Sequence, residues 1–177
     1  MRIYLLGYMY SGKTTVGHRL ALQLGYQWLD LDQAFESTYH TSIPIFFKRY
    51  GEKAFRQLEQ KLLHGTASLD NVVISTGGGT PCNFDNMQWI NQHGKSVYFD
   101  VTVETLLCRA AKSKKPRPIL AGMTEEERSL YVREQLSQRL PHYQKAQIIF
   151  PADDPDQDRL TQLLVQSISL CGESCMR

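Results

Sequence analysis

Short apolar runs alternate with longer segments of helical periodicity along the chain. Five runs stand out, each followed by glycine, proline or a carboxylate: Ile3–Leu6, Trp28–Leu31, Val72–Ser75, Val97–Asp100 and Ile148–Phe150. Strands that alternate with helices in this way are typical of βαβ units, in which helices cover a parallel sheet. We therefore predict an α/β fold of three layers, α/β/α, around a five-stranded parallel sheet.

The segment after the first run has the periodicity of an amphipathic helix. Val16, Leu20 and Leu24 recur at the spacing of one helix face, and Gly25 follows as a residue suited to a left-handed helix end. The pattern predicts a helix between the first two strands, with its apolar face packed on the sheet.

Two later helices are bounded by equally specific residues. Pro44 favours a helix start and Gly51 a helix end, so we expect a helix between them. Thr124 and Glu127 have the spacing of a capping box, in which each side chain accepts a hydrogen bond from the other residue's backbone amide. This pattern predicts a helix that runs from Thr124 to about Leu140.

Composition and charge narrow the class of protein without identifying it. The 177 residues are 42% hydrophobic and 21% charged, with a net charge of +2, which is ordinary for a single globular domain over residues 1–177. So small a charge does not call for nucleic acid or an anionic membrane as partner, and no apolar stretch approaches the ~18 residues of a membrane span. The four scattered cysteines lack zinc-ligand spacing and favour reduced thiols in the cytoplasm.

The strongest chemical motif is a phosphate-binding loop. Residues 7–14 are Gly-Tyr-Met-Tyr-Ser-Gly-Lys-Thr, which fits G-x-x-x-x-G-K-[ST] and lies between a predicted strand and a predicted helix. Backbone amides of such a loop surround phosphate oxygens, and the helix N-terminus adds partial positive charge. Lys13 would reach the β- and γ-phosphates, and Thr14 would give its hydroxyl to Mg²⁺. The motif predicts binding of a nucleoside triphosphate.

Two aspartates follow the second run. Alternate residues of a strand share one face, so we expect Asp30 and Asp32 side by side, roughly 6–7 Å apart, at the carboxyl end of the sheet where ligands bind. One carboxylate would hold a water of the metal, and the other would face a substrate hydroxyl. Aspartates that cap a helix or form a turn are the alternative, which the pattern leaves open.

Two further segments indicate where an acceptor would bind. Gly77, Gly78 and Gly79 follow the third run and remove every side chain at a point where a ligand or another backbone segment can come close. A mobile lid is expected over about residues 112–124, where Arg117 between two prolines would deliver a cation to the transferred phosphoryl group. A flexible turn and a solvated loop are the respective alternatives.

Taken together, these motifs resemble the shikimate kinase family. Besides the phosphate loop, the aspartate pair and the triple glycine, the chain has Phe55-Arg56-x-x-Glu59, Arg117-Pro-Ile-Leu and Arg139-x-Pro-x-Tyr143 in the family's order. The resemblance spans residues 7–143. It implies the P-loop fold of nucleoside monophosphate kinases and transfer of the ATP γ-phosphate to the 3-hydroxyl of shikimate, with Mg²⁺, in aromatic amino acid biosynthesis. Members of this family are commonly monomeric.

The resemblance also implies the residues of both binding sites. Nucleotide contacts are expected from the phosphate loop, a stacking arginine and the lid, namely Tyr10, Ser11, Gly12, Lys13, Thr14, Thr15, Arg109 and Arg117. Shikimate contacts are expected from a helical segment over about residues 32–62, the glycines and a later arginine, namely Asp32, Arg56, Gly77, Gly78, Gly79 and Arg139. Thr14 and Asp30 would serve the metal, and Glu59 would orient Arg56.

Catalysis would rest on three of these residues by the same resemblance. Lys13 and Arg117 would stabilise charge on the transferred group, and Asp32 would accept the proton of the attacking hydroxyl. Arg56 and Arg139 would clamp the shikimate carboxylate, because a planar guanidinium pairs with two oxygens at once.

The chain departs from the family pattern at two places. Tyr10 stands where the family usually has glycine, so a positive φ at this residue would be strained. Residues 150–155 differ from the family's adenine-contacting segment, which leaves the base contacts open.

Three other functions compete with the resemblance. A small-molecule P-loop kinase of the gluconate kinase type would share the ATP site, but the Arg56–Arg139 pair and the triple glycine argue against it. A nucleoside monophosphate kinase would need a base-reading pocket that the sequence does not reveal. A nucleotide-binding module without turnover would have no need of Lys13, Asp32 and Arg117 together.

Overall fold

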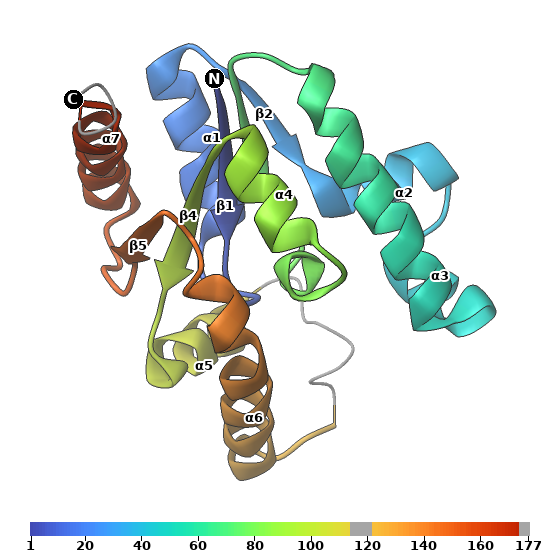
Figure 1. The fold of residues 1–177 in the computed structure, drawn as a ribbon. Helices are drawn as coiled ribbons and strands as arrows, with labels where there is room; N and C mark the ends of the chain where they lie inside the picture. Colours follow the sequence, from blue (N-terminus) through green and yellow to red (C-terminus); the bar gives the residue numbers. More distant parts are fainter. Residues whose placement is uncertain (114–121, 174–177) are drawn as a thin grey trace.

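The computed structural model describes residues 1–113 and 122–173. Five parallel strands form one sheet in the order β2-β3-β1-β4-β5 (Figure 1). The strands are β1 (Arg2–Leu6), β2 (Gln27–Asp30), β3 (Val72–Ser75), β4 (Lys95–Asp100) and β5 (Ile148–Pro151). The prediction of a five-stranded parallel α/β sheet is therefore confirmed.

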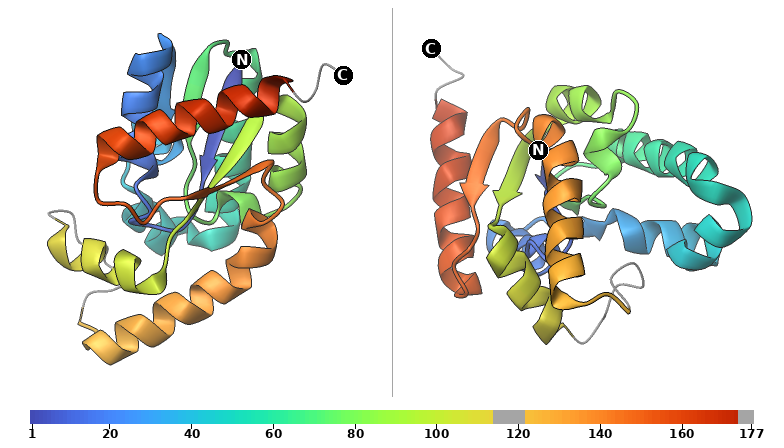
Figure 2. Two further views of the ribbon diagram at one scale, coloured as in Figure 1. Left: turned by 90° about the vertical axis from the view of Figure 1, so that its left-hand side faces the viewer. Right: turned by 90° about the horizontal axis from the view of Figure 1, so that it is seen from below.

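Helices connect the strands and cover the sheet. They are α1 (Lys13–Leu24), α2 (Leu31–Tyr39), α3 (Ile43–Gly65), α4 (Asn86–His93), α5 (Val103–Lys112), α6 (Glu125–Tyr143) and α7 (Gln157–Glu173), with short 3₁₀ turns η1 (Thr66–Ser68) and η2 (Thr80–Cys82). From below, the sheet lies between α7 on one side and α3 and α4 on the other (Figure 2). Within the described ranges, no helix combines the length and apolar character needed to cross a bilayer.

Alternate residues of β1 fill two separate cores. Ile3 and Leu5 are buried in a cluster with residues of α1 and α7, whereas Tyr4 and Leu6 are buried in a second cluster with Leu63 of α3 and residues of α4. Because successive side chains of a strand point to opposite faces, a central parallel strand that is apolar throughout needs cover on both. The apolar run at the start of the chain therefore requires helices on both faces of the sheet, which gives the three layers of the fold.

The strand register brings the candidate segments to one edge of the sheet. Leu5 of β1 and Asp30 of β2 both pair with Ser75 of β3, so these three strands end at the same level. The phosphate loop, the start of α2 and the glycine segment 77–79 follow directly from those ends. The site is therefore assembled where ligands bind in open α/β sheets.

The helix signals in the sequence match the structure closely. Gly25 ends α1 in the left-handed conformation, with φ of 68°, and Thr124 and Glu127 form the predicted capping box at the start of α6. α6 continues past Leu140 to Tyr143. Gly51, with φ of 79°, breaks α3 into two helical parts, which is the interruption that its sequence position predicted.

The second strand begins and ends one residue earlier than predicted, and the expected pairing of its aspartates is wrong. β2 ends at Asp30, and Leu31 already begins α2. Asp30 is the N-cap of this helix, and its Oδ1 accepts hydrogen bonds from the backbone amides of Asp32, at 3.0 Å, and Gln33, at 3.2 Å. Asp32 therefore belongs to the first helical turn and does not share a strand face with Asp30. Such a cap is favourable because it satisfies backbone donors that a helix start leaves unpaired.

An aromatic cluster holds α2 against α3. The rings of Phe35, Phe46 and Phe55 are buried together. The ring centroid of Phe35 lies 5.1 Å from that of Phe46 and 4.8 Å from that of Phe55. These two helices project from the side of the sheet (Figure 1). This packing fixes the orientation of α3 next to the residues that face the glycine segment 77–79.

Candidate active site

The phosphate loop curls around the Lys13 side chain. Lys13 Nζ donates hydrogen bonds to the carbonyl oxygens of Gly7, at 2.9 Å, and Tyr8, at 2.8 Å, and to Ser11 Oγ, at 3.2 Å. The side chain is buried, with 8% of the residue exposed. The loop itself thus holds the ammonium group where α1 begins, next to the backbone amides that suit an anion.

Tyr10 adopts a left-handed backbone conformation with φ of 63°. Tyr10→Gly and Tyr10→Ala both remove the ring, but only glycine adopts this φ without steric cost. We therefore expect the glycine variant to be more stable than the alanine variant by about 1 kcal/mol in urea unfolding. Equal stability, or a more stable alanine variant, would contradict the strain assigned to this residue.

The two residues expected to serve the metal lie in contact. Thr14 Oγ1 donates a hydrogen bond of 3.0 Å to Asp30 Oδ2, while Asp30 Oδ1 caps α2. Among the described residues there is no group of three or more His, Cys, Asp or Glu side chains able to hold a metal ion. One hydroxyl and one carboxylate at a phosphate loop suit Mg²⁺, which keeps most of its water and is bound largely by nucleotide phosphates.

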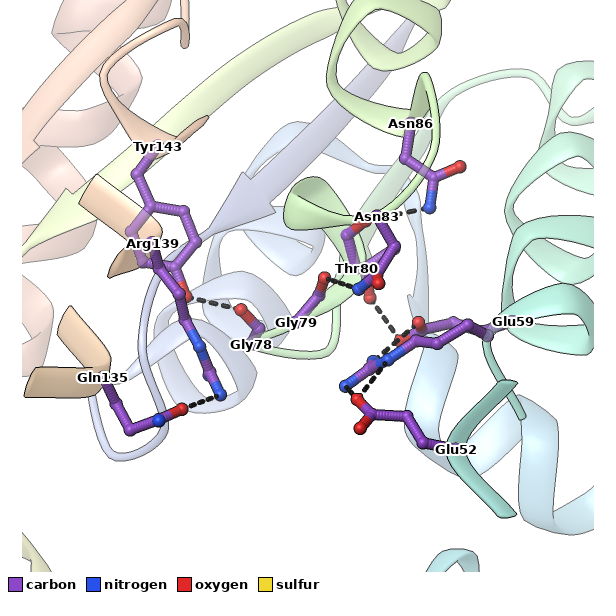
Figure 3. A network of polar contacts seen from close by, with 11 residues as sticks. Glu52, Glu59, Gly78, Gly79, Thr80, Asn83, Asn86, Gln135, Arg139 and Tyr143 are labelled. Atoms are coloured by element: carbon purple, nitrogen blue, oxygen red, sulfur yellow. Dashed lines mark hydrogen bonds and ion pairs between the residues drawn. The ribbon is translucent and has the colours of Figure 1, made fainter. Parts of the chain in front are cut away.

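Arg56 of α3 is held by two carboxylates, those of Glu52 and Glu59, both of which Figure 3 labels. Its Nη1 donates to Glu59 Oε2 at 2.8 Å, and its Nη2 donates to Glu52 Oε1 at 3.0 Å. Burial acts to lower the pKa of Arg56, but the charges and hydrogen bonds of Glu59 and Glu52 outweigh it and raise the pKa. Glu59 is only 4% exposed and also accepts a 2.6 Å hydrogen bond from Thr80 Oγ1. The guanidinium is therefore charged and fixed in direction.

The glycine segment 77–79 brings the other acceptor residues together. A Cβ on Gly77 would lie 2.8 Å from Asp32 Oδ1, and one on Gly78 would lie 3.3 Å from Arg139 Nη1. The first separation is shorter than real Cβ contacts, so a side chain at Gly77 would require Asp32 to shift. α2 and α6 thus each place a charged side chain directly on the backbone of this segment.

Gly79 is the glycine that faces Arg56. A Cβ there would lie 2.6 Å from Arg56 Nη2 and 2.7 Å from Arg56 Nη1. Because a guanidinium is the far end of a long side chain, Gly79→Ala should displace Arg56 without unfolding the protein. We expect the KM for the acceptor substrate to rise about tenfold, as for loss of one charged hydrogen bond. Gly65→Ala, whose Cβ meets nothing within 4 Å, is the control. Equal KM values in the two variants would contradict this steric account.

α6 supplies the second arginine and a support for the glycine segment. Arg139 Nη2 donates to Gln135 Oε1 at 2.9 Å, and Tyr143 Oη donates to the carbonyl oxygen of Gly78 at 2.5 Å (Figure 3). Tyr143 is fully buried and stacks on Tyr98, with ring centroids 5.0 Å apart. Gln135 was not predicted from the sequence, although its place four residues before Arg139 on a helix was a signal for contact.

Cys82 follows the glycine segment in η2 and lies near the two acceptor arginines. Burial raises the pKa of the Cys82 thiol to about 11, although the charges of Arg139 and Arg56 act to lower it. The thiol is therefore uncharged near neutral pH.

Arg109 of α5 connects the phosphate loop to the segment after β5. Its Nη1 donates to the carbonyl oxygen of Ser11 at 3.1 Å, and its Nη2 donates to the carbonyl oxygen of Ala152 at 2.8 Å. This position lies beside residues 150–155, where the sequence left the adenine contacts open. Arg117 and most of the expected lid, residues 114–121, lie outside the described residues.

Comparisons with known proteins agree on one family. A family model described as shikimate kinase matches residues 9–169. The shikimate kinase of Phocaeicola vulgatus is 42% identical over 167 residues, which are 94% of this chain and 95% of that protein.

Solved structures give the same result. A crystal structure of shikimate kinase from Bacteroides thetaiotaomicron has a TM-score of 0.93 at 39% identity and covers 96% of this chain and 98% of that chain. Shikimate kinase from Acinetobacter baumannii in complex with shikimate has a TM-score of 0.87 at 33% identity, covering 99% and 95%. A gluconokinase from Sinorhizobium meliloti, with a TM-score of 0.60 at 15% identity and coverage of 98% and 97%, shares the fold alone.

Proposed function

The chain belongs to the shikimate kinase family, and we propose that the residues around the phosphate loop and the glycine segment carry out the family's reaction. That reaction transfers the γ-phosphate of ATP to the 3-hydroxyl of shikimate and serves aromatic amino acid biosynthesis. One observation supports the proposed roles: Arg56 and Arg139, from two helices far apart in sequence, both face the segment 77–79.

The proposed acceptor site binds shikimate through its carboxylate and its ring hydroxyls. Arg56 and Arg139 pair with the carboxylate, an arrangement that suits planar guanidinium groups, which can each bind two oxygens. Glu59 and Thr80 support this role, because their hydrogen bonds keep Arg56 in one orientation. The glycine segment contacts the ring through its backbone.

The proposed phosphoryl transfer depends on positioning and electrostatics. Asp32, at the start of α2 and next to Gly77, holds the 3-hydroxyl and accepts its proton during attack. Lys13 moves from the loop carbonyls to the β- and γ-phosphates and stabilises their charge. Arg117 of the lid acts on the same group, a role that rests on the family motif alone.

The oxygen ligands that Thr14 and Asp30 present fit Mg²⁺ bound with ATP. When present, the ion would offset negative charge on the β- and γ-phosphates. The Thr14 hydroxyl would coordinate it, and Asp30 would hold one of its water molecules. Asp30 contacts Thr14 with one carboxylate oxygen and caps α2 with the other. It therefore connects the proposed metal site to the helix that carries Asp32.

The remaining proposals concern the organisation of the protein. Residues 1–177 form one domain, with a lid over about residues 112–124 and an acceptor-binding segment over about residues 32–62. The protein acts as a monomer in the cytoplasm, without a nucleic acid or membrane partner. The net charge of +2 supports the lack of a nucleic acid or anionic membrane partner, and among the described residues one chain supplies every proposed site residue, which supports the monomer.

Each alternative function would leave part of the assembled site without a role. A gluconate-kinase-type enzyme shares the fold but has no use for two arginines that face one glycine segment. A nucleotide-binding module without turnover would not need Lys13, Thr14, Asp30 and Asp32 gathered at one edge of the sheet.

The position of the new phosphate tests the proposed geometry. The protein is incubated with Mg·ATP and shikimate, and the product is analysed by phosphorus NMR for coupling to the ring proton at carbon 3. We expect the phosphate on the 3-hydroxyl. Phosphate on the 4- or 5-hydroxyl would contradict the placement of Asp32 beside the attacking oxygen.

A further inference from the structure

Tyr8 of the phosphate loop lies under one of the two acceptor arginines. Cζ of Arg139 lies over the Tyr8 ring, 5.2 Å from its centroid. This distance falls within the ~6 Å at which a cation is attracted to the face of an aromatic ring. Tyr8 occupies a variable position of the loop motif, so the motif assigned it no role.

The Tyr8 ring is buried and held by its surroundings. Tyr8 is 2% exposed and belongs to the same buried cluster as Val132 of α6. Its hydroxyl has no hydrogen-bond partner among the described residues. Burial raises the pKa of this hydroxyl to about 12, with Arg139 acting in the opposite direction. The ring face is the part of Tyr8 that lies against Arg139.

The ring constrains Arg139 without occupying its donors. Gln135 accepts one hydrogen bond from Nη2, and the Tyr143 hydroxyl is a second hydrogen-bonding neighbour of the guanidinium. The Tyr8 ring under Cζ restricts the guanidinium further without using any of its N–H groups, which can still pair with a carboxylate. Fixing such a group before binding lowers the entropy lost when the ligand binds.

Tyr8 also touches the nucleotide side of the site. Its carbonyl oxygen accepts a hydrogen bond from Lys13 Nζ. We propose that Tyr8 is a positioning residue for the binding of shikimate. Its aromatic ring holds Arg139 in place relative to the phosphate loop. This inference rests on the proposed role of Arg139 as a carboxylate ligand.

Three variants test the inference. Tyr8→Met keeps a long apolar side chain and removes the ring, Tyr8→Phe keeps the ring and removes the hydroxyl, and Arg139→Ala removes the cation. For each, kcat and the KM values for shikimate and ATP are measured, and thermal unfolding shows that the variant is folded. We expect Tyr8→Met to raise the shikimate KM about fivefold, with kcat within about twofold and the ATP KM unchanged. Tyr8→Phe should restore the shikimate KM.

The outcomes distinguish the positioning role of Tyr8 from the carboxylate contact of Arg139. If Arg139→Ala raises the shikimate KM while Tyr8→Met and Tyr8→Phe have equal KM values, the positioning role of Tyr8 is wrong and the role of Arg139 stands. If Arg139→Ala leaves the shikimate KM unchanged, the proposed carboxylate contact is wrong and the inference about Tyr8 is overturned with it.

Discussion

Lys13→Met should lower kcat about 10²–10³-fold, as expected for loss of one preorganised charged donor to the transferring group. Methionine keeps the length and apolar character of the side chain but cannot stabilise the phosphate charge. The measurement is kcat with saturating Mg·ATP and shikimate. Lys145→Met, which changes an exposed lysine, is the matched control and should leave kcat unchanged.

Stability must be measured beside activity, because Lys13 also bonds the loop. Its ammonium group donates to the carbonyl oxygens of Gly7 and Tyr8, so the variant loses loop contacts as well as charge. A thermal unfolding curve distinguishes a folded, inactive variant from a misfolded one. A folded Lys13→Met protein with kcat within tenfold of the unsubstituted protein would contradict the proposed catalytic role.

Arg139→Ala should raise the KM for shikimate about 10–100-fold, the effect of losing charged hydrogen bonds worth ~1.5–3 kcal/mol. The ATP KM should stay close to its original value, because the guanidinium faces Gly78 on the acceptor side. Arg133→Ala removes an exposed arginine of the same helix, which pairs with Glu104, and should leave both KM values unchanged.

Arg56→Ala should give a similar rise in the shikimate KM together with a loss of stability. Glu59 is 4% exposed, and removal of Arg56 would leave this buried carboxylate without its charged partner. Such a loss typically costs ~3–5 kcal/mol. A shikimate KM within twofold of the original value in both folded arginine variants would contradict the proposed carboxylate clamp.

The sequence predicted the sheet and the phosphate loop because local signals determine both. Apolar runs that end in turn residues mark parallel strands, and a loop with glycines at fixed spacing has few other structures to adopt. Gly25 and the Thr124–Glu127 capping box were predictable for the same reason, since a helix end is satisfied by residues close in sequence.

The point at which the second strand gives way to a helix was not predicted, nor were contacts between distant segments. Asp30 and Asp32 were assigned to one strand face, but the alternation of side chains ends where Asp30 caps α2 and the backbone becomes helical. The hydrogen bond from Thr80 to Glu59 and the position of Arg139 Cζ over the Tyr8 ring join residues from different elements. Such pairs follow from how the helices pack on the sheet, which no local pattern contains.

The most direct test of the account is ADP release from Mg·ATP with different acceptors. Shikimate, gluconate, AMP and a sample without acceptor are compared under the same conditions. The account predicts rapid release that requires shikimate. Equal release with gluconate or AMP, or no release with any acceptor despite ATP binding, would contradict the claim that this site phosphorylates shikimate.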